Sequence, residues 1–406
     1  MDHQCPDVST FQRSNVQTNS RSNFPTPAPG LNGGSNATAV RTAPQPVVTE
    51  TSLPGPGSSL AQQTTVIVVA HNSGAYLHDC ISSIFRAELD VEIVLVDNAS
   101  TDSSVEDVHA RFPAVRVLRS DRNLGFGAGN NLGAQVAMGE YLAFLNPDAV
   151  VEPGWLQALV DALRDDPRTG MVTSKVLQMD EPDKISACGL DLHVTGLALA
   201  RGSKMHRDAF PEVDEVAAVS GASFAIRKDL YEDLGGFDPD FFLYMEDIDL
   251  SWRARLAGYR IVHVPPSVIY HDYTLHFGPK KTFYQERNRY LMLLKSLRWR
   301  TLLLLTPALL LAEVVTWGFV LLRERRHLSN KVRAYGSIMT NWPGILEGRQ
   351  RTRKLRQVQD RDLISSCTHQ LDYAQTGSGP MAWLAQKVFD PLFLAFQKLT
   401  LALIRW

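Results

Sequence analysis

Residues 141–151 read YLAFLNPDAVV, an apolar run that breaks at Asn146-Pro147-Asp148 and then resumes. A short continuous apolar run is typical of a strand that is buried on both faces of a parallel sheet. Pro147 has no backbone N–H to donate and disfavours helical geometry at Asn146, so the strand must end here. Asp148 is therefore predicted on a loop at the carboxyl end of a strand, which is the edge where open α/β sheets bind ligands.

This strand is part of a repeating pattern. The runs TTVIVVA (64–70), VEIVLV (91–96) and VRVL (115–118) each precede a loop, and apolar residues at helical spacing follow the loop. Strands that alternate with helices at this interval indicate βαβ crossovers. We therefore predict an α/β fold on a Rossmann-like, doubly wound and mostly parallel sheet.

The alternation weakens past residue 171, where short helices and a smaller region of mixed sheet are expected. EDIDLSWRARLAG (246–258) predicts a helix with acids in its first turn and a glycine at its end, an arrangement that suits the helix dipole. IVHVPP (261–266) predicts a closing strand. The chain has no internal repeat of solenoid length.

The formal net charge of −2 gives no indication of a nucleic-acid partner. Residues 323–361 contain eleven Lys and Arg and three acids, a net charge of +8, so the rest of the chain carries −10. The cysteines are Cys5, Cys80, Cys188 and Cys367. They form no CxxC pair, which argues against a zinc knuckle or a disulfide scaffold and favours a reducing, cytosolic setting.

Three regions are predicted along the chain. Residues 1–63 are rich in Pro, Ser, Thr and Asn and lack an apolar core, so we expect disorder. Residues 64–290 are expected to form the α/β domain, and residues 291–406 a helical tail that associates with a membrane.

The tail contains an apolar segment at 301–322, TLLLLTPALLLAEVVTWGFVLL, which is long enough to span a bilayer. Pro307, the acid Glu313 and basic residues on both sides leave the topology open. An embedded or re-entrant segment, a helix in the membrane interface and a core helix of a soluble protein are the alternatives. An intramembrane acid costs about 2.5–3.5 kcal/mol on insertion scales, too little to exclude a span so rich in Leu.

A second apolar helix is predicted at 383–406. Its apolar stripe comprises Val388, Leu392, Phe396, Leu399 and Leu403, between Trp383 and Trp406. The helix either packs against the protein or lies in the membrane interface. The neighbouring basic segment 323–361 favours the interface, because cationic residues attract anionic lipids.

Acidic and amide side chains follow two of the predicted strands. Asp97-Asn98 comes after VEIVLV with Asp102 in the same loop, and Asp148 comes after YLAFL. Each of them taken alone is compatible with a helix cap, which is the favoured interpretation of Asp102. Together they line one sheet edge, where Asp97 suits a nucleotide base or ribose and Asp148 suits a divalent metal on a diphosphate.

The start of the helix 246–258 is the second place that indicates chemistry. Glu246 and Asp247 are adjacent carboxylates, so each raises the proton affinity of the other while the helix dipole lowers it. This balance is typical of a general base. His271 follows the last predicted strand and is a candidate to complete a metal site with Asp148.

NLGFGAGNN (123–131) does not have the glycine spacing of a dinucleotide fingerprint. Its glycines permit either close packing of a helix or a close approach of the backbone to a ligand. On the second alternative, Asn123 and Gly125 are candidates for ligand binding.

These stretches resemble the inverting family 2 glycosyltransferases of the GT-A fold, especially the bacterial rhamnosyltransferase-like branch. The resemblance covers residues 64–290, and RNRYLMLLK (287–295) resembles the segment that leads into the membrane-proximal tail of such enzymes. It is carried by VIVVAHNS (66–73), VLVDNASTDSS (94–104), NLGFGAGNN (123–131), FLNPDA (144–149) and GGFDPDFFLYMEDIDLSWRARLAGY (235–259).

The resemblance implies a role for each matching position. His71 matches a residue placed against the nucleotide base, and Asp97 or Asn98 matches an acid that binds the base or ribose. Asp148 matches the last residue of the D-x-D metal motif, which takes Mg²⁺ or Mn²⁺. His271 matches a histidine that completes the metal shell in some members.

The resemblance also implies that Asp247 is the catalytic base of the ED motif, beside Glu246. Two positions depart from the family, because Asn146 replaces the first acid of D-x-D and Asn98 replaces a second Asp. An amide coordinates a metal weakly or binds a sugar hydroxyl, and it brings no charge. Asn146 is therefore counted among the donor-binding residues.

The expected partners are a dTDP- or UDP-sugar, with rhamnose favoured by the resemblance alone, and a lipid-linked or polysaccharide acceptor of the cell envelope. The expected location is the cytoplasmic face of the cell membrane. Because Asn146 weakens the metal motif, a non-catalytic, membrane-tethered nucleotide-sugar-binding protein is the alternative function.

Overall fold

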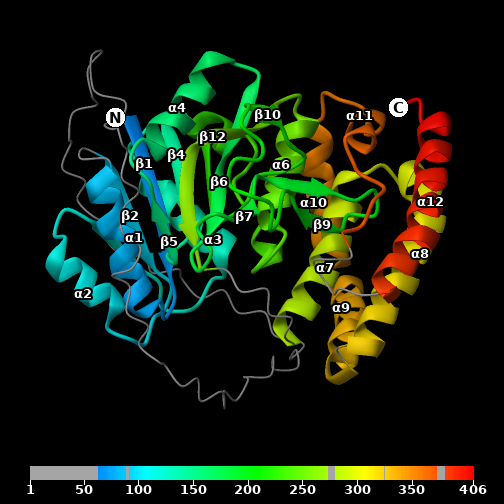
Figure 1. Ribbon diagram of the computed structural model, residues 1–406, viewed down its shortest axis with the longest axis horizontal. Helices are drawn as coiled ribbons and strands as arrows, with labels where there is room; N and C mark the ends of the chain where they lie inside the picture. The colour runs from blue at the N-terminus through cyan, green and yellow to red at the C-terminus, as the bar shows by residue number, and fades with distance from the viewer. Residues whose placement is uncertain (1–62, 88–90, 273–278, 324, 373–379) are drawn as a thin grey trace, which may run out of the picture. The chain divides into compact units, whose positions relative to one another are not determined.

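The computed structural model describes residues 63–87, 91–272, 279–323, 325–372 and 380–406 (Figure 1). The segment predicted to be disordered, 1–63, lies outside these ranges apart from Gln63. The described residues of the predicted domain 64–290 and of the predicted tail 291–406 lie in one compact unit, Leu53–Trp406. The boundary between domain and tail stays a prediction.

The first half of the domain is the predicted parallel sheet. The strands β1 (Thr64–Ala70), β2 (Glu92–Asp97), β3 (Arg116–Arg119) and β4 (Tyr141–Leu145) lie in the order β3-β2-β1-β4 with parallel pairing throughout. The helices between them are α1 (Gly74–Ala87), α2 (Ser104–Arg111) and α3 (Phe126–Val136). The strand order reverses between β1 and β4, so their carboxyl ends form the crevice expected of a ligand site.

The second half is mixed, as the weaker alternation predicted. The strand β11 (Ser223–Arg227) runs antiparallel between β4 and β6 (Thr169–Gln178), and β12 (Arg260–His271) runs parallel to β6. Shorter strands flank them, namely β5 (Ala149–Val151), β7 (Ile185–Ala187), β8 (Leu190–Leu192), β9 (Ala198–Ala200) and β10 (Asp214–Glu215).

The predicted closing strand 261–266 is too short, because β12 continues to His271. The register between β12 and β6 slips after Val264, and pairing resumes at Val268. Pro265 and Pro266 lie in this interruption, where the ladder requires no N–H donor. His271 is consequently the last residue of the strand and not a loop residue after it.

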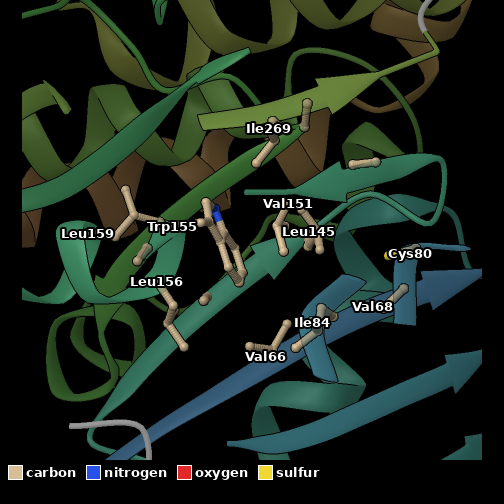
Figure 2. Packing of buried hydrophobic residues seen from close by; sticks show 14 of the residues in the cluster. Val66, Val68, Cys80, Ile84, Leu145, Val151, Trp155, Leu156, Leu159 and Ile269 are labelled. Carbon is tan, nitrogen blue, oxygen red and sulfur yellow. The ribbon is translucent and has the colours of Figure 1, made fainter. Parts of the chain in front are cut away.

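Helices cover both faces of the sheet. Alternate residues of β1 point to opposite sides, so Val66 and Val68 pack on one face while Ile67 and Val69 pack on the other. On the first face, α1 and α4 (Trp155–Asp165) contribute Ile84, Trp155 and their neighbours to the core (Figure 2). The remaining elements of the domain are α5 (Lys228–Asp233), the 3₁₀ turn η3 (Pro239–Phe241) and α6 (Glu246–Leu256).

The tail is helical, as predicted. Its helices are α7 (Pro279–Ser296), α8 (Trp299–Arg323), α9 (Leu328–Thr340), α10 (Trp342–Leu355), α11 (Asp360–Ser365) and α12 (Pro380–Leu403), with the 3₁₀ turn η4 (Arg325–His327) before α9. Trp252 and Leu256 of α6 share a buried cluster with Leu293 of α7 and Leu305 of α8. The tail therefore packs directly on the helix that carries Glu246 and Asp247.

The apolar segment forms α8, in which Trp299–Leu321 is long and apolar enough to cross a membrane. Glu313 faces the protein, where it pairs with Arg289 at 2.5 Å and with Lys331 at 3.2 Å. Only 22 % of the most apolar stretch of α8 is buried inside the protein. The core helix of a soluble protein would be mostly buried. The helix α8 is thus bound to α7 and α9 through Glu313 and also packs against α12, while Leu303, Leu310, Val314 and Leu321 remain exposed.

The predicted stripe of α12 is largely exposed. Val388, Leu392, Leu399 and Leu403 are 43–57 % exposed, whereas Phe396 packs with the buried Phe393 against α8. The helices α8 and α12 lie side by side at one edge of this unit (Figure 1). On α8, Leu303, Leu310, Val314 and Leu321 are exposed as well, so both helices present apolar side chains to solvent.

Candidate functional site

The carboxyl ends of β1 and β2 carry the first group of predicted site residues. His71 is exposed, and its Nδ1 lies 2.9 Å from the carbonyl oxygen of Asn98. Because a carbonyl only accepts, the imidazole proton resides on Nδ1. Asp97 is buried and accepts from the Ser100 N–H at 2.8 Å and from Arg119 at 3.0 Å. Both oxygens of Asp97 thus have partners within the protein.

Asn98 uses its whole amide to hold the glycine loop. Its Nδ2 donates to Asn123 Oδ1 and to the Gly125 carbonyl, each at 3.1 Å, and its Oδ1 accepts from the Leu124 N–H at 2.8 Å. The side chain of Asn98 is 2 % exposed. The amide that stands in place of the family's second Asp therefore shapes the loop.

The loop meets the segment before α6 at Gly125. This glycine has φ +83°, and a Cβ built on it would lie 2.1 Å from the Phe242 carbonyl oxygen. The neighbouring Phe126 N–H donates to that same oxygen at 2.8 Å. Only glycine fits there, which favours close packing as the role of the loop. Within α3 a Cβ on Gly129 would clash with Val69 in the same way.

The segment before α6 is strained. Phe242, Tyr244 and Met245 all have positive φ, between 57° and 72°, which costs non-glycine residues about 1–3 kcal/mol each. Asn288 of α7 is fully buried and donates to the carbonyls of Phe241, Leu243 and Tyr244 at 2.7–2.9 Å. One side chain of the tail therefore stabilises the backbone that leads into Glu246 and Asp247.

The carboxyl end of β4 meets the end of β12. Nε2 of His271 lies 3.0 Å from Asp148 Oδ1 and 3.2 Å from the Asn146 amide nitrogen. His271 is 6 % exposed, and Asp148 is open to solvent. The structure thus brings together Asn146, Asp148 and His271, which are far apart in the sequence.

This group fits a divalent cation. Two cis ligands at about 2.0–2.1 Å from a metal are separated by roughly 3 Å, close to the separations found here. Nε2 of His271 donates to Asp148 in one tautomer and accepts from Asn146 in the other. Among the described residues no three or more His, Cys, Asp or Glu gather as a metal site. At this place the described part of the chain offers Asp148, His271 and the amide of Asn146.

Acidic groups surround the same place. The hydrogen bond from Tyr76 to Asp272, together with burial and the charges of Asp148 and Asp180, raises the pKa of Tyr76 to about 12. Tyr76 extends from α1 and is half exposed. A negative potential at a half-exposed sheet edge favours the binding of a cation.

Asp247 lies at the start of α6. Its Oδ2 accepts from the Gly221 N–H at 2.8 Å, and its Oδ1 accepts from the Ile248 N–H at 2.9 Å. Burial raises the pKa of the Asp247 carboxyl, against the effect of these two N–H donors. Asp247 as a whole is partly buried. It is a carboxylate with a fixed orientation and raised basicity.

Glu246 is the inner member of the pair. Its side chain is 5 % exposed, and its Oε2 is buried without a hydrogen bond within the described residues. Burial first, and the charge of Asp247 second, raise the pKa of Glu246 more than that of its neighbour. The geometry therefore favours a protonated Glu246 beside an ionised Asp247.

Two other acids have local roles. Asp249 is buried and pairs with Arg253 at 2.7 Å within α6. Asp102 accepts from the Gly74 N–H at 3.0 Å and from the Ser104 hydroxyl at 2.7 Å. It thus serves the starts of α1 and α2, as the capping interpretation predicted.

A turn between Val219 and Ser223 connects the two halves of the site. The Asn146 N–H donates to the Ala222 carbonyl at 3.0 Å, while the adjacent Gly221 donates to Asp247. The candidate metal group and the candidate base therefore share one short backbone link. Sequence reasoning did not identify Gly221, Tyr76 or Asn288, since each acts through a fold contact and belongs to no recognised motif.

The comparisons with known proteins concern the same part of the chain. The family model described as glycosyl transferase family 2 matches residues 65–235. The N-acetylglucosaminyl-diphospho-decaprenol L-rhamnosyltransferase of Mycobacterium tuberculosis is 29 % identical over 229 residues, which are 51 % of this chain and 75 % of that protein. Human polypeptide N-acetylgalactosaminyltransferase 10 is 27 % identical over 227 residues, 52 % of this chain and 38 % of that protein.

Solved structures resemble the chain more loosely. TarS of S. aureus aligns with a TM-score of 0.48 at 16 % identity, over 83 % of this chain and 90 % of the TarS chain. GalNAc-T7, crystallised with UDP, GalNAc and Mn²⁺, aligns with a TM-score of 0.49 at 22 % identity, over 59 % of this chain and 49 % of that one. At TM-scores below 0.5, nothing about this chain's ligands follows from them.

Proposed function

The chain belongs to the family 2 glycosyltransferases of the GT-A fold, and we propose that it moves a sugar from a nucleotide diphosphate to an acceptor hydroxyl with inversion. The observation that carries this proposal is the carboxyl of Asp247 at the start of α6, which is oriented by the Gly221 N–H and belongs to a partly buried residue. Its pKa is raised by burial, so it binds a proton more readily than an ordinary aspartate.

Asp247 is assigned as the general base. It takes the proton of the acceptor hydroxyl as that oxygen attacks the anomeric carbon. The bond from the anomeric carbon to the diphosphate oxygen breaks on the opposite face, and its electron pair leaves with the nucleoside diphosphate. Glu246, held protonated by burial beside it, keeps the charge of the pair at one and so leaves Asp247 as the carboxylate.

Asp148 and His271 are assigned as the residues that would hold a Mg²⁺ or Mn²⁺ ion, with the amide of Asn146 beside them. Such a cation would neutralise negative charge on the departing diphosphate. Asp148 Oδ1 and His271 Nε2 already lie 3.0 Å apart in a region of negative potential. These two side chains would therefore need to move little to bind a cation.

The nucleotide is proposed to lie over the ends of β1 and β2. His71 presents an exposed imidazole there, and Asp97 keeps lone pairs beyond those used by Ser100 and Arg119. Asn98, Asn123 and Gly125 act in donor binding through the loop that they fix. The M. tuberculosis relative, which is named as an L-rhamnosyltransferase, supports rhamnose as the first donor sugar to test.

The acceptor is proposed to be a lipid-linked glycan at the cytoplasmic face of the membrane. Support comes from that relative, whose name describes a diphospho-decaprenol substrate, and from the exposed apolar residues of α8 and α12. Because Glu313 is bound to Arg289 and Lys331, we propose that α8 lies along the membrane surface and does not cross it alone.

Transfer assays with the full chain test this function. The donor is chosen by a binding screen of dTDP-, UDP- and GDP-sugars, and product is measured with lipid-linked acceptors in Mn²⁺ buffer. Wild type should form product, while Asp148→Ala should lose transfer and Asp161→Ala, a change on α4 outside the site, should keep it. Donor binding without transfer or hydrolysis under all conditions would support the non-catalytic alternative.

A further inference from the structure

A cavity of about 950 Å³ lies in the tail, away from the sheet edge. Its walls come from the α7–α8 junction, from one side of α10 and from Trp406 after α12. None of the candidate site residues lines it. It is therefore a separate feature of the fold, which the proposed transfer reaction does not use.

The cavity is lined by cations and by no acid. The basic residues in its wall are Lys295, Arg298, Arg300, Arg349, Arg353 and Arg356. Lys295 is neutralised by Asp238 and Asp240, each at 2.7 Å, and Arg356 by Asp360 at 2.5 Å. Within the described part of the chain, the four remaining guanidiniums form no ion pair with a carboxylate. The wall thus holds about four uncompensated positive charges.

Aromatic rings hold two of these guanidiniums in place. The Arg349 guanidinium lies 3.9 Å from the centre of the Trp299 ring, and that of Arg300 lies 5.6 Å from the centre of the Trp406 ring. Contact with a ring orients a guanidinium while N–H groups at its edge stay available to an anion. In Arg349, Nη1 already donates to the Leu294 carbonyl, so the other N–H groups are the ones left for an anion. The guanidinium groups of Arg300 and Arg349 are therefore partly pre-organised for a planar, bidentate contact with an anion.

An unpartnered hydroxyl lies in the same wall. Ser296 is 2 % exposed, and its Oγ makes no hydrogen bond within the described residues. Asp360, the carboxylate that pairs with Arg356 of this wall, also accepts from the Arg298 N–H and the Thr301 hydroxyl. An oxygen of a bound anion would give this buried hydroxyl an acceptor.

We propose that this cavity binds a phosphate-bearing anion through Arg298, Arg300, Arg349 and Arg353. Guanidinium groups match phosphate oxygens in pairs, and four of them exceed what a single carboxylate would require. The inference extends the proposed membrane contact and is independent of the transfer reaction. The phosphate belongs either to an anionic lipid headgroup or to a soluble phosphate compound.

The position of the cavity favours the lipid source. It lies at the first turn of α8 and beyond the last turn of α12, the two helices that lie side by side in Figure 1. Leu303 of α8 and Leu403 of α12, near these ends, are 73 % and 49 % exposed. A lipid whose phosphate enters the cavity would have exposed apolar side chains along its path.

The test compares the full chain with the double variant Arg298→Gln/Arg353→Gln, and uses Arg333→Gln as the control. Neither replaced residue of the double variant has a carboxylate partner among the described residues, so the fold should persist. Arg333 is an exposed cation of the same basic segment, on α9 and outside the cavity. The two probes are phosphatidylglycerol vesicles in a flotation assay and inorganic pyrophosphate in a calorimetric titration with EDTA present.

Wild type and Arg333→Gln should bind at least one probe, and the double variant should bind it roughly 10- to 30-fold more weakly. Binding to vesicles but not to pyrophosphate assigns the phosphate to a lipid headgroup, and the reverse assigns it to a soluble compound. Equal affinities of the double variant and the control, or no binding of either probe by wild type, would overturn the proposal. Because EDTA removes the metal and no sugar is added, failure here leaves the transfer proposal untouched.

Discussion

Gly221 donates its backbone N–H to Oδ2 of Asp247 at 2.8 Å, although 26 residues separate the two in the chain. A Cβ added to Gly221 would lie 3.0 Å from that same oxygen, which is closer than an ordinary contact. The turn between β10 and β11 therefore decides where the carboxylate of α6 points. A hydrogen bond to the charged form lowers the pKa of an acid, so Gly221 opposes the effect of burial.

This relationship predicts the pH dependence of transfer. Asp247 must be ionised to accept a proton, so kcat/KM should fall as the pH drops through a pKa that lies above the usual value of about 3.9 for aspartate. Gly221→Ala should push the carboxylate away from its donor and move this acidic limb to higher pH. The control variant Gly336→Ala should keep the pH dependence of wild type. If the acidic limb of the pH profile were also unchanged in Gly221→Ala, the assignment of Asp247 as the base would be contradicted.

The group formed by Asn146, Asp148 and His271 predicts that two substitutions change the Mn²⁺ dependence of transfer in opposite directions. His271→Ala should weaken the response of transfer to Mn²⁺ by about tenfold or more, because one of two strong ligands is lost. Asn146→Asp should strengthen it, because a second carboxylate joins Asp148 near His271. The concentration of Mn²⁺ that gives half-maximal transfer measures both, and a tighter metal response in His271→Ala would be incompatible with this site.

The strained segment before α6 predicts a role for a residue that contacts no substrate. Asn288→Ala removes the donor to the carbonyls of Leu243 and Tyr244, so the neighbouring positive-φ residues Phe242, Tyr244 and Met245 should relax. As a positioning residue, Asn288 should affect kcat more than the KM for the donor. A loss of thermal stability with an unchanged kcat would show a purely structural role.

Gly125 predicts a stability difference. In Gly125→Ala the new Cβ would collide with the Phe242 carbonyl at a positive φ, whereas Gly336→Ala in α9 meets no atom within 4 Å. The first change should lower the free energy of unfolding by about 1–3 kcal/mol or more. The second should leave it unchanged or raise it by about 0.5–1 kcal/mol. Urea unfolding of both variants measures the difference.

The sequence predicted the parallel half of the sheet well, because runs such as VEIVLV and the break at Pro147 are local signals. It predicted β12 poorly, since the interruption at Pro265 and Pro266 depends on pairing with β6. The proximity of Asp148 and His271 was anticipated from the place of each residue at the end of a predicted strand, and the resemblance implied it as well. The turn that orients Asp247 was not anticipated, because every residue except proline has a backbone N–H and the sequence does not show which one will contact a side chain.

The amide positions show a second limit. Asn98 was placed with the donor, yet in the structure all of its amide contacts hold the loop Asn123–Gly125. An amide suits either role, and the choice depends on which groups the fold brings within 3 Å of it. The contribution of Asn98 to donor binding stays a prediction.

The central claim is that Asp247 is the base of a sugar transfer. Single-turnover transfer by Asp247→Asn, measured beside donor affinity, tests it most directly. The asparagine of Asp247→Asn can still accept the Gly221 N–H, so its fold and its donor Kd should match those of wild type. The control variant Asp229→Asn changes an exposed residue of α5 and should transfer sugar at the wild-type rate. The account predicts a rate about 10²- to 10⁴-fold lower for Asp247→Asn. A rate within about threefold of wild type would contradict it.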